Sequence, residues 1–296
     1  MRRLARILDR WRSIARIEGR LEKLQEAVGR IEARQVGGAG ADTAWHDREF
    51  KVFSQWGEDG LIDYLVSVVG VTRRVFVEFG VESYQESNTR FLLVHRGWSG
   101  LVLDGSETCM ESLRREPLYW RHDLQAQTAF VTRENIDSLL LANKVEGDIG
   151  LLSIDIDGND YWVWEATSVI RPAIVVIEYN ARFGPDIAVT IPYDPGFTRA
   201  AAHYSMIYYG VSLRALWLLG RRKGYDLVGC NSAGNNAFFV RSDLRPAILP
   251  ALDARHAWRP ACFRESRNPD NTLAFLKPEA ETALLLRLPL ISVEEI

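Results

Sequence analysis

The chain has 296 residues, of which 47% are hydrophobic and 25% are charged, and its net charge is −3. This composition is typical of a globular protein with a sizeable core, and the charge argues against a general nucleic-acid binder. The three cysteines, at positions 109, 230 and 262, are far apart, which argues against a disulfide framework or a C-x-x-C zinc site and favours reduced thiols in the cytoplasm. No apolar run reaches the roughly 18 residues of a membrane span, and the N-terminus lacks the apolar run of a signal peptide.

Residues 1–36 are predicted to form one amphipathic helix, because their apolar residues recur at spacings of three and four. From Ile17 onward the spacing is that of a short coiled-coil seam. Residues 1–20 also carry seven arginines against two acidic residues. The arm could therefore join identical chains into a homo-oligomer, or residues 1–20 could contact the anionic inner face of a membrane. A helix that packs on its own domain is the third interpretation.

Glycines at positions 37, 38 and 40 are expected to end this helix and to begin a linker over residues 37–48. Residues 49–296 then form the main domain. Its apolar runs at 75–79, 100–104, 128–132, 149–157 and 173–178 alternate with helical segments, and those at 225–230 and 236–240 are close enough for a hairpin. The pattern predicts an α/β, Rossmann-like, doubly wound sheet, mostly parallel, with an antiparallel hairpin at the C-terminal end.

Acidic residues follow the first strands of the predicted sheet, at the edge where such sheets bind ligands. The first strand ends with Glu78 and Gly80, where the glycine permits close backbone approach and the acid can accept from an amino group. Asp104 ends the second strand and is placed to accept both ribose hydroxyls of an adenosine. Glu134 and Asn135 follow the third strand and could pair with the adenine edge. Each acid could instead cap a helix, but together they favour an adenosine site.

The fourth and fifth predicted strands end in further oxygen-bearing side chains. Asp155 and Asp157 share one face of the fourth strand, and such carboxylates repel unless a cation, a donor or a proton intervenes. Glu178 and Asn180 are likewise two residues apart on the fifth strand. Asp155, Glu178 and Asn180 are therefore candidate ligands of Mg²⁺ or Mn²⁺. Helix capping by the same residues is the alternative.

Six motifs spread over residues 50–240 point to one family. They are F-S-Q-W-G-E-D at 53–59, F-V-E-F-G at 76–80, L-S-I-D-I-D-G-N-D-Y at 152–161, V-I-E-Y-N at 176–180, I-P-Y-D-P at 191–195 and N-N-A-F-F-V at 235–240. In this combination the chain resembles the FkbM-type branch of class I methyltransferases. The resemblance implies methyl transfer from S-adenosylmethionine, commonly to a hydroxyl on a sugar, glycan or polyketide-like product. The positions of Asp155, Glu178 and Asn180 also resemble the metal sites of catechol-type and macrolide-sugar O-methyltransferases.

One motif departs from the family. Its usual second glycine is missing, because Gly80 is followed by Val-Glu-Ser-Tyr-Gln. The methionine end of the cofactor would then be held by other residues, with Ser54, Gln55 and Asn88 as candidates. Gln55 and Asp155 complete the expected cofactor contacts.

Methyl transfer to a hydroxyl requires alignment of donor and acceptor and removal of the hydroxyl proton. Asp157 and His203 are the two candidate bases. The expected acceptor pocket is lined by aromatic, acidic and amide side chains, which suit a sugar: Tyr193, Asp194, Tyr208, Tyr209, Asn231 and Asn235.

Two other functions fit part of the pattern. In a nucleotide-sugar glycosyltransferase, Asp155-Ile156-Asp157 would be a metal-binding D-x-D motif, which leaves Glu78 and Asp104 without a role. In a non-catalytic scaffold, the chain would assemble through its N-terminal helix. Binding of S-adenosylmethionine or of a nucleotide sugar would separate these possibilities.

Overall fold

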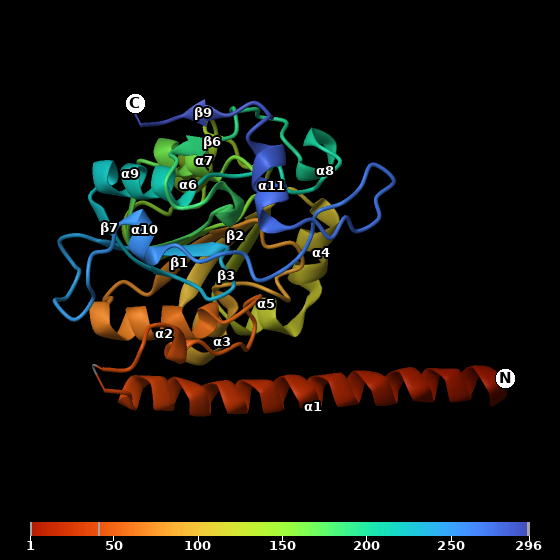
Figure 1. The fold of residues 1–296 in the computed structure, drawn as a ribbon. Coiled ribbons are helices and arrows are strands. Elements are labelled where there is room, and N and C mark those ends of the chain that lie inside the picture. The colour runs from red at the N-terminus through yellow and green to blue at the C-terminus, as the bar shows by residue number, and fades with distance from the viewer. Residues whose placement is uncertain (1, 41, 295–296) are drawn as a thin grey trace.

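The computed structural model describes residues 2–40 and 42–294, and a seven-stranded sheet forms its centre (Figure 1). The strand order is β3-β2-β1-β4-β5-β8-β7, with β1 to β5 parallel and β8 antiparallel to both of its neighbours. The strands are β1 (Val75–Phe79), β2 (Ser99–Asp104), β3 (Leu124–Thr128), β4 (Gly147–Ile154), β5 (Ile170–Glu178), β7 (Tyr225–Cys230) and β8 (Asn236–Arg241). The Rossmann-like doubly wound sheet with a C-terminal antiparallel hairpin is thus confirmed.

Helices cover both faces of the sheet, because alternate strand residues are apolar on each side. Phe76, Val102 and Val176 form one core with α2 (Glu58–Val69), α3 (Arg90–Arg96) and α4 (Glu107–Arg115), beside which lies α5 (Pro117–Arg121). Val77, Leu103 and Ile177 form the other core with α6 (Ile136–Ala142), α7 (Asp160–Ala166) and α9 (Leu213–Lys223). These two apolar layers bury the central strands on both faces.

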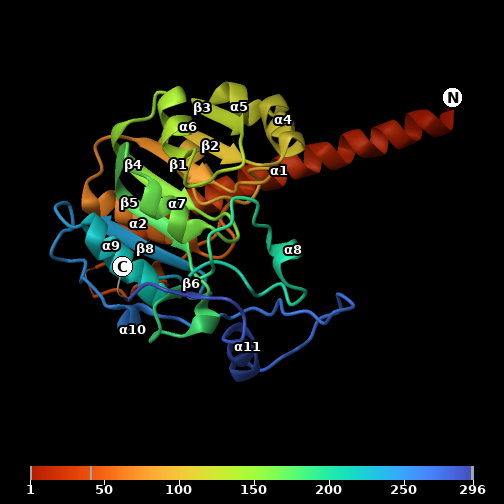
Figure 2. The same ribbon diagram turned by 90° about the horizontal axis from the view of Figure 1, so that it is seen from above.

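Segments after β5 and β8 form a smaller layer beside the carboxyl ends of the strands (Figure 2). The layer contains the short helices η2 (Ala181–Phe183), α8 (Arg199–Ala202), α10 (Ala254–Ala257) and α11 (Pro278–Leu285), together with the pair β6 (Val189–Thr190) and β9 (Ile291–Ser292). The buried guanidinium of Arg182 in η2 lies 2.8 Å from Glu281 in α11 and 2.9 Å from Glu265 in the loop before it. This ion network fixes the C-terminal segment against the end of β5.

Helix α1 (Arg2–Gly38) runs beneath the domain, and its N-terminal part projects beyond it in both views (Figures 1 and 2). Its C-terminal half belongs to the core, since Ala33 and Val36 are buried and a Cβ on Gly29 would lie 2.4 Å from Val52. The helix extends to Gly38, beyond the position where the glycines were expected to end it. The 3-10 helix η1 (His46–Arg48) lies within the predicted linker. Across residues 2–40 and 42–294, no helix is both long and apolar enough to cross a membrane.

The predicted strand borders hold for six strands to within a few residues, but the third was misplaced. The strand is Leu124–Thr128, and residues 129–132 form the loop after it. This shift moves the ligand-binding edge away from Glu134 and Asn135.

Candidate functional site

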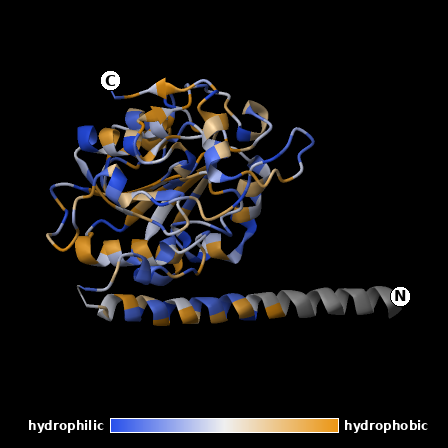
Figure 3. Cartoon of the chain, viewed as in Figure 1, coloured by the Kyte–Doolittle hydropathy of each residue, from blue (hydrophilic) through white to orange (hydrophobic). Residues whose placement is uncertain are grey.

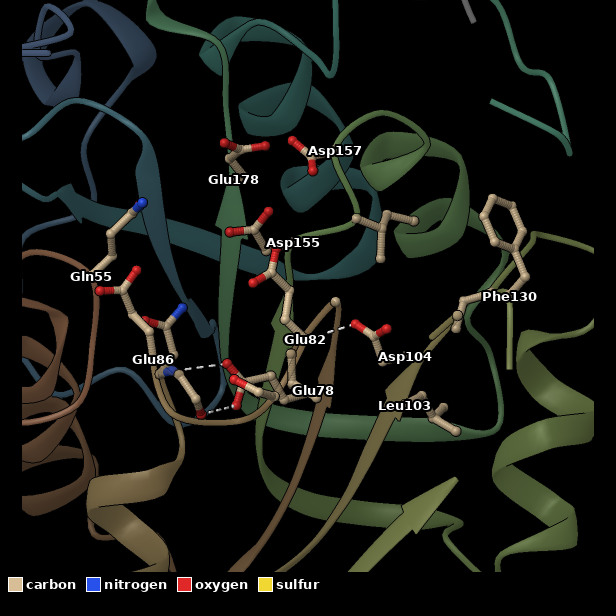
Figure 4. Close-up of a pocket in the computed structure, with 18 of the residues that line it drawn as sticks. Gln55, Glu78, Glu82, Glu86, Leu103, Asp104, Phe130, Asp155, Asp157 and Glu178 are labelled. Carbon is tan, nitrogen blue, oxygen red and sulfur yellow. Dashed lines mark hydrogen bonds between the residues drawn. The ribbon is translucent and has the colours of Figure 1, made fainter. Parts of the chain in front are cut away.

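A cavity of about 560 Å³ lies over the carboxyl ends of the strands, where the order reverses between β1 and β4 (Figure 4). Open α/β sheets bind ligands at this position. Eight of the predicted site residues line it: Gln55, Glu78, Gly80, Asn88, Asp104, Asp155, Asp157 and Glu178. The others lie outside its lining: Ser54, Glu134, Asn135, Asn180, Tyr193, Asp194, His203, Tyr208, Tyr209, Asn231 and Asn235.

The loop after β1 forms the floor of the cavity. Gly80 has φ +74° and a Cβ there would lie 1.5 Å from the carbonyl oxygen of Asp155, so only glycine fits. Glu82 and Tyr84 also have positive φ, at 45° and 62°. The loop therefore adopts left-handed conformations without the second glycine whose absence the sequence showed, at a conformational cost of about 1–2 kcal/mol for each non-glycine residue.

Glu78 lines the cavity, but its carboxylate is occupied by the loop before α3. It accepts hydrogen bonds from the backbone N–H groups of Asn88 (2.8 Å) and Thr89 (3.2 Å) and from the hydroxyls of Ser87 (2.7 Å) and Thr89 (2.5 Å). Burial raises its pKa, and these donors oppose the rise. Glu78 therefore shapes the cavity by holding this loop, which is a different role from the expected contact with an amino group.

Asp104 is half-buried at the end of β2 and faces the cavity (Figure 4). One carboxylate oxygen accepts from the backbone N–H of Glu82 and the other from that of Ser106, both at 2.7 Å. A carboxylate has about four acceptor sites, so the remaining ones are available to a ligand with vicinal hydroxyls. These two bonds fix the orientation of the carboxylate before a ligand arrives.

The expected adenine contacts need correction. Asn135 closes its own turn, accepting from the N–H of Thr132 (2.8 Å) and donating to the carbonyl of Phe130 (2.8 Å), while exposed Glu134 accepts from the hydroxyl of Tyr193. In their place Leu103, Gly105 and residues 129–131 line this end of the cavity, with Phe130 half-exposed. A flat apolar ring suits a purine better than an exposed carboxylate does.

At the other end of the cavity, Asp155 and Asp157 after β4 and Glu178 at the end of β5 point toward one another (Figure 4). Burial, followed by the charge of Asp157, raises the pKa of Asp155 well above its usual range. Burial, followed by the charge of Asp155, does the same for Glu178. The pair therefore favours a shared proton or a cation over two adjacent negative charges.

Asp157 differs from these two carboxylates. Its side chain is 58% exposed, its φ is 57°, and it lies 3.1 Å from the guanidinium of Arg199. Arg199 also pairs with Glu265 and lies 4.0 Å over the ring of Tyr209. Asp155 is the better candidate for taking up a proton, because burial raises its pKa.

Three buried acceptor atoms have no hydrogen-bond partner among the described residues and belong to side chains that line this end: Glu178 Oε2, Asn159 Oδ1 and Asn236 Oδ1. Asn236 is opposite Glu178 in the β5–β8 pair, and its Nδ2 donates to Glu58 (3.0 Å). A ligand that enters here must bring hydrogen-bond donors or positive charge, since buried acceptors without partners are costly.

Asn180 does not line the cavity. Its Nδ2 donates to the carbonyls of Ile207 (2.9 Å) and Tyr209 (3.1 Å), and its Oδ1 accepts from the N–H of Arg182 (3.2 Å). The amide thus caps η2, and Asn236 presents an oxygen beside Glu178 in its place. Within the part of the chain that the structure describes, no three His, Cys, Asp or Glu side chains group as metal ligands.

His203 and the expected acceptor residues have structural roles. His203 Nδ1 lies 2.7 Å from the hydroxyl of Ser205 in a turn, and burial lowers its pKa. The hydroxyl of Tyr209 donates to Glu265 (3.1 Å), and the Asp194 carbonyl accepts from Asn159 (2.8 Å). Asn231 accepts the N–H groups at 234–236, donates to Glu58 (2.6 Å) and Asn235 (2.7 Å), and thereby holds the β7–β8 turn.

Among the cavity residues that sequence reasoning missed are Phe130, Asn159, Phe197, Arg199 and Asn236. Two of them stood in quoted motifs, since Asn159 follows Asp157-Gly158 and Asn236 begins β8. Phe197 and Arg199 lie in the segment around α8, where no periodicity or motif marks them.

The solved structures that this chain resembles include two methyltransferases and a further domain with SAH bound. An O-methyltransferase from Bacillus cereus in complex with SAH has 14% identity over 73% of this chain and 88% of that one, with a TM-score of 0.40. The N-terminal domain of EvdMO1 with SAH bound has 14% identity over 71% and 94%, with a TM-score of 0.39. The CurJ carbon methyltransferase has 10% identity over 62% and 52%, with a TM-score of 0.42.

Comparison with protein-family profiles and with curated proteins gave no match.

Proposed function

We propose that this protein is an S-adenosylmethionine-dependent methyltransferase that acts on a hydroxyl of a sugar, glycan or related polyhydroxylated acceptor. The observation that carries the proposal is the continuity of the cavity from the ends of β1, β2 and β3 to those of β4, β5 and β8. One end presents the half-buried Asp104 carboxylate and an apolar wall, and the other presents carboxylate and amide oxygens. A nucleoside methyl donor and a hydroxylated acceptor would thus lie side by side.

At the first end, Asp104 would accept the ribose hydroxyls while Phe130 and Leu103 border the adenine. The bound cofactor supplies an activated methyl group. Gly80 leaves room for a ligand to approach the backbone closely, and the polar side chains of Gln55 and Asn88 also line the cavity. Holding two bound reactants in alignment lowers the activation barrier of their reaction by up to about 7–11 kcal/mol.

At the second end, the unpartnered oxygens of Glu178, Asn159 and Asn236 would accept hydrogen bonds from acceptor hydroxyls. Asp155, whose pKa burial raises well above its usual range, would take the proton of the reacting hydroxyl. A general base is most effective when its pKa lies near the working pH, and the raised pKa of Asp155 is closer to neutral pH than that of an ordinary carboxyl group. The ion pair with Arg199 would hold the side chain of Asp157 in place.

A divalent cation is the second means of stabilising the carboxylate pair. Asp155, Glu178 and Asn236 offer the oxygen donors that Mg²⁺ and Mn²⁺ prefer, and two of these donors include an unpartnered buried oxygen. A bound cation would lower the pKa of an acceptor hydroxyl. Titration of the protein with Mn²⁺ followed by electron paramagnetic resonance tests this without any need for the acceptor.

Calorimetry with SAH and with UDP-glucose tests the proposed function itself. We expect SAH to bind and UDP-glucose not to bind. The reverse result would favour a glycosyltransferase that uses Asp155 and Asp157, and the absence of binding by either compound would favour a non-catalytic scaffold.

A further inference from the structure

Helix α1 presents a continuous apolar seam to solvent. Five of its apolar side chains, at alternating spacings of four and three, are each about half exposed or more: Ile17 (56%), Leu21 (60%), Leu24 (62%), Val28 (49%) and Ile31 (51%). Figure 3 shows separate hydrophobic bands along the part of this helix that it colours. In the sequence, the same repeat continues back through Ile14 to Ile7, interrupted by Arg10. Scattered exposed apolar residues are ordinary, but a regular row of this length is not.

The domain does not use this seam. It is contacted by another face of α1, where Gly29 packs on Val52 and Phe91, Glu22 pairs with Arg90 at 2.7 Å, and Gln25 donates to the Val52 carbonyl. At 3.6 residues per turn, that docked face lies about a third of a turn from the seam. A partner on the seam would therefore meet the helix without displacing the domain from it.

We propose that the seam packs against the same seam of a second copy of this chain, as a two-stranded coiled coil. Positions 21 and 28 are then a positions of the heptad and 17, 24 and 31 are d positions, all of them apolar. With positions 7 and 14, the repeat spans the four heptads that coiled coils of this kind need. The helix also projects beyond the domain (Figures 1 and 2), so a second helix can lie along it over most of its length.

The charges beside the seam favour a parallel pair. One flank carries Arg20 and Arg34 at g positions, and the other carries Glu32 at an e position, as Glu18 does in the sequence. In a parallel coiled coil the g flank of one helix lies along the e flank of the other, and residues 18, 25 and 32 of that e flank include no arginine or lysine, so like charges are kept apart. An antiparallel pair would set arginines against arginines.

Sedimentation velocity of the full chain tests this inference. We expect the wild type at tens of micromolar to have twice the 33.6 kDa mass of one chain. The double variant Leu21→Lys/Leu24→Lys should be monomeric, with a dissociation constant raised at least about 100-fold, because two buried apolar contacts are replaced by charges. Leu141→Lys is the matched control, since Leu141 on α6 is 48% exposed and outside the seam, and it should remain dimeric.

Circular dichroism checks that each variant is folded, which we expect because the substituted positions are exposed. A monomeric wild type would overturn the inference, and so would a double variant that stays dimeric. A monomeric wild type that sediments with phosphatidylglycerol vesicles, but not with phosphatidylcholine vesicles, would overturn it in favour of an anionic membrane surface as the occupant of the seam.

Discussion

Replacement of Asp104 by alanine tests whether a nucleoside binds where the cavity borders β2. In the structure, the Asp104 carboxylate accepts only the two backbone N–H groups of Glu82 and Ser106, each at 2.7 Å, and it faces the cavity. A ribose would add two hydrogen bonds to this charged acceptor. Hydrogen bonds to charged groups contribute about 1.5–3 kcal/mol each, and part of this is compensated by water that enters the site of the variant. We therefore expect a net loss of about 2–3 kcal/mol.

Such a loss weakens binding of SAH by roughly 30- to 150-fold, since about 1.4 kcal/mol corresponds to a factor of ten. Isothermal titration calorimetry measures it directly. Asp104→Asn is a necessary second variant, because it keeps an acceptor for one loop amide and so separates ligand contact from loop support. Asp123→Ala is the matched control, since Asp123 is an exposed aspartate immediately before β3 and outside the cavity. If both Asp104 variants bind SAH as tightly as the wild type and the control do, the nucleoside assignment is refuted.

Three further outcomes follow from single side chains. Glu82→Gly should raise the free energy of unfolding by about 1 kcal/mol in urea denaturation, because glycine removes the strain of φ 45°; a lower value would contradict the left-handed loop. Burial raises the pKa of Asp59 to about 6, although hydrogen bonds from the amides of residues 52–54 oppose this rise. The proton on Asp59 therefore stabilises the folded state at pH 4, and this stabilisation is lost as the pH rises toward 7. Asp59→Asn should remove about 2–3 kcal/mol of this pH dependence of unfolding, and an unchanged pH profile would argue against it. If a cation binds, Asp155→Asn should abolish Mn²⁺ binding while SAH binding stays within about threefold; Mn²⁺ binding that survives would disprove these ligands.

The sheet could be predicted because its central strands are continuous apolar runs, which are typical of strands that are buried on both faces. The third strand was not, because it lies at the edge of the sheet and reads Leu-Gln-Ala-Gln-Thr, with polar residues on one face. The loop that follows, at 129–132, is more apolar and includes Val131, whose side chain is buried in the core, so residues 128–132 were predicted to be the strand.

Strand ends located the cavity, but they could not reveal which oxygens were already in use. Glu78 and Asn180 are at strand ends and both are satisfied by local backbone groups, a pattern that depends on loop geometry. The acids of the F-S-Q-W-G-E-D motif likewise bind the chain itself. Asp59 accepts three backbone amides, and Glu58 holds the side chains of Asn231 and Asn236. The acidic residues of the motifs therefore stabilise the loops around the cavity as often as they are available to a ligand.

The position of β8 has a consequence for synthesis of the chain. This strand lies between β5 and β7 but is made after both, so β5 has an unpaired edge with buried-type residues such as Ile174 and Val176 until residue 241 has left the ribosome. Nascent chains that stop before Asn236 should therefore be captured by chaperones or aggregate. Insertion of β8 closes that edge and, in the same step, brings Asn236 opposite Glu178. A newly made chain thus acquires its complete cavity only when its last hairpin is in place.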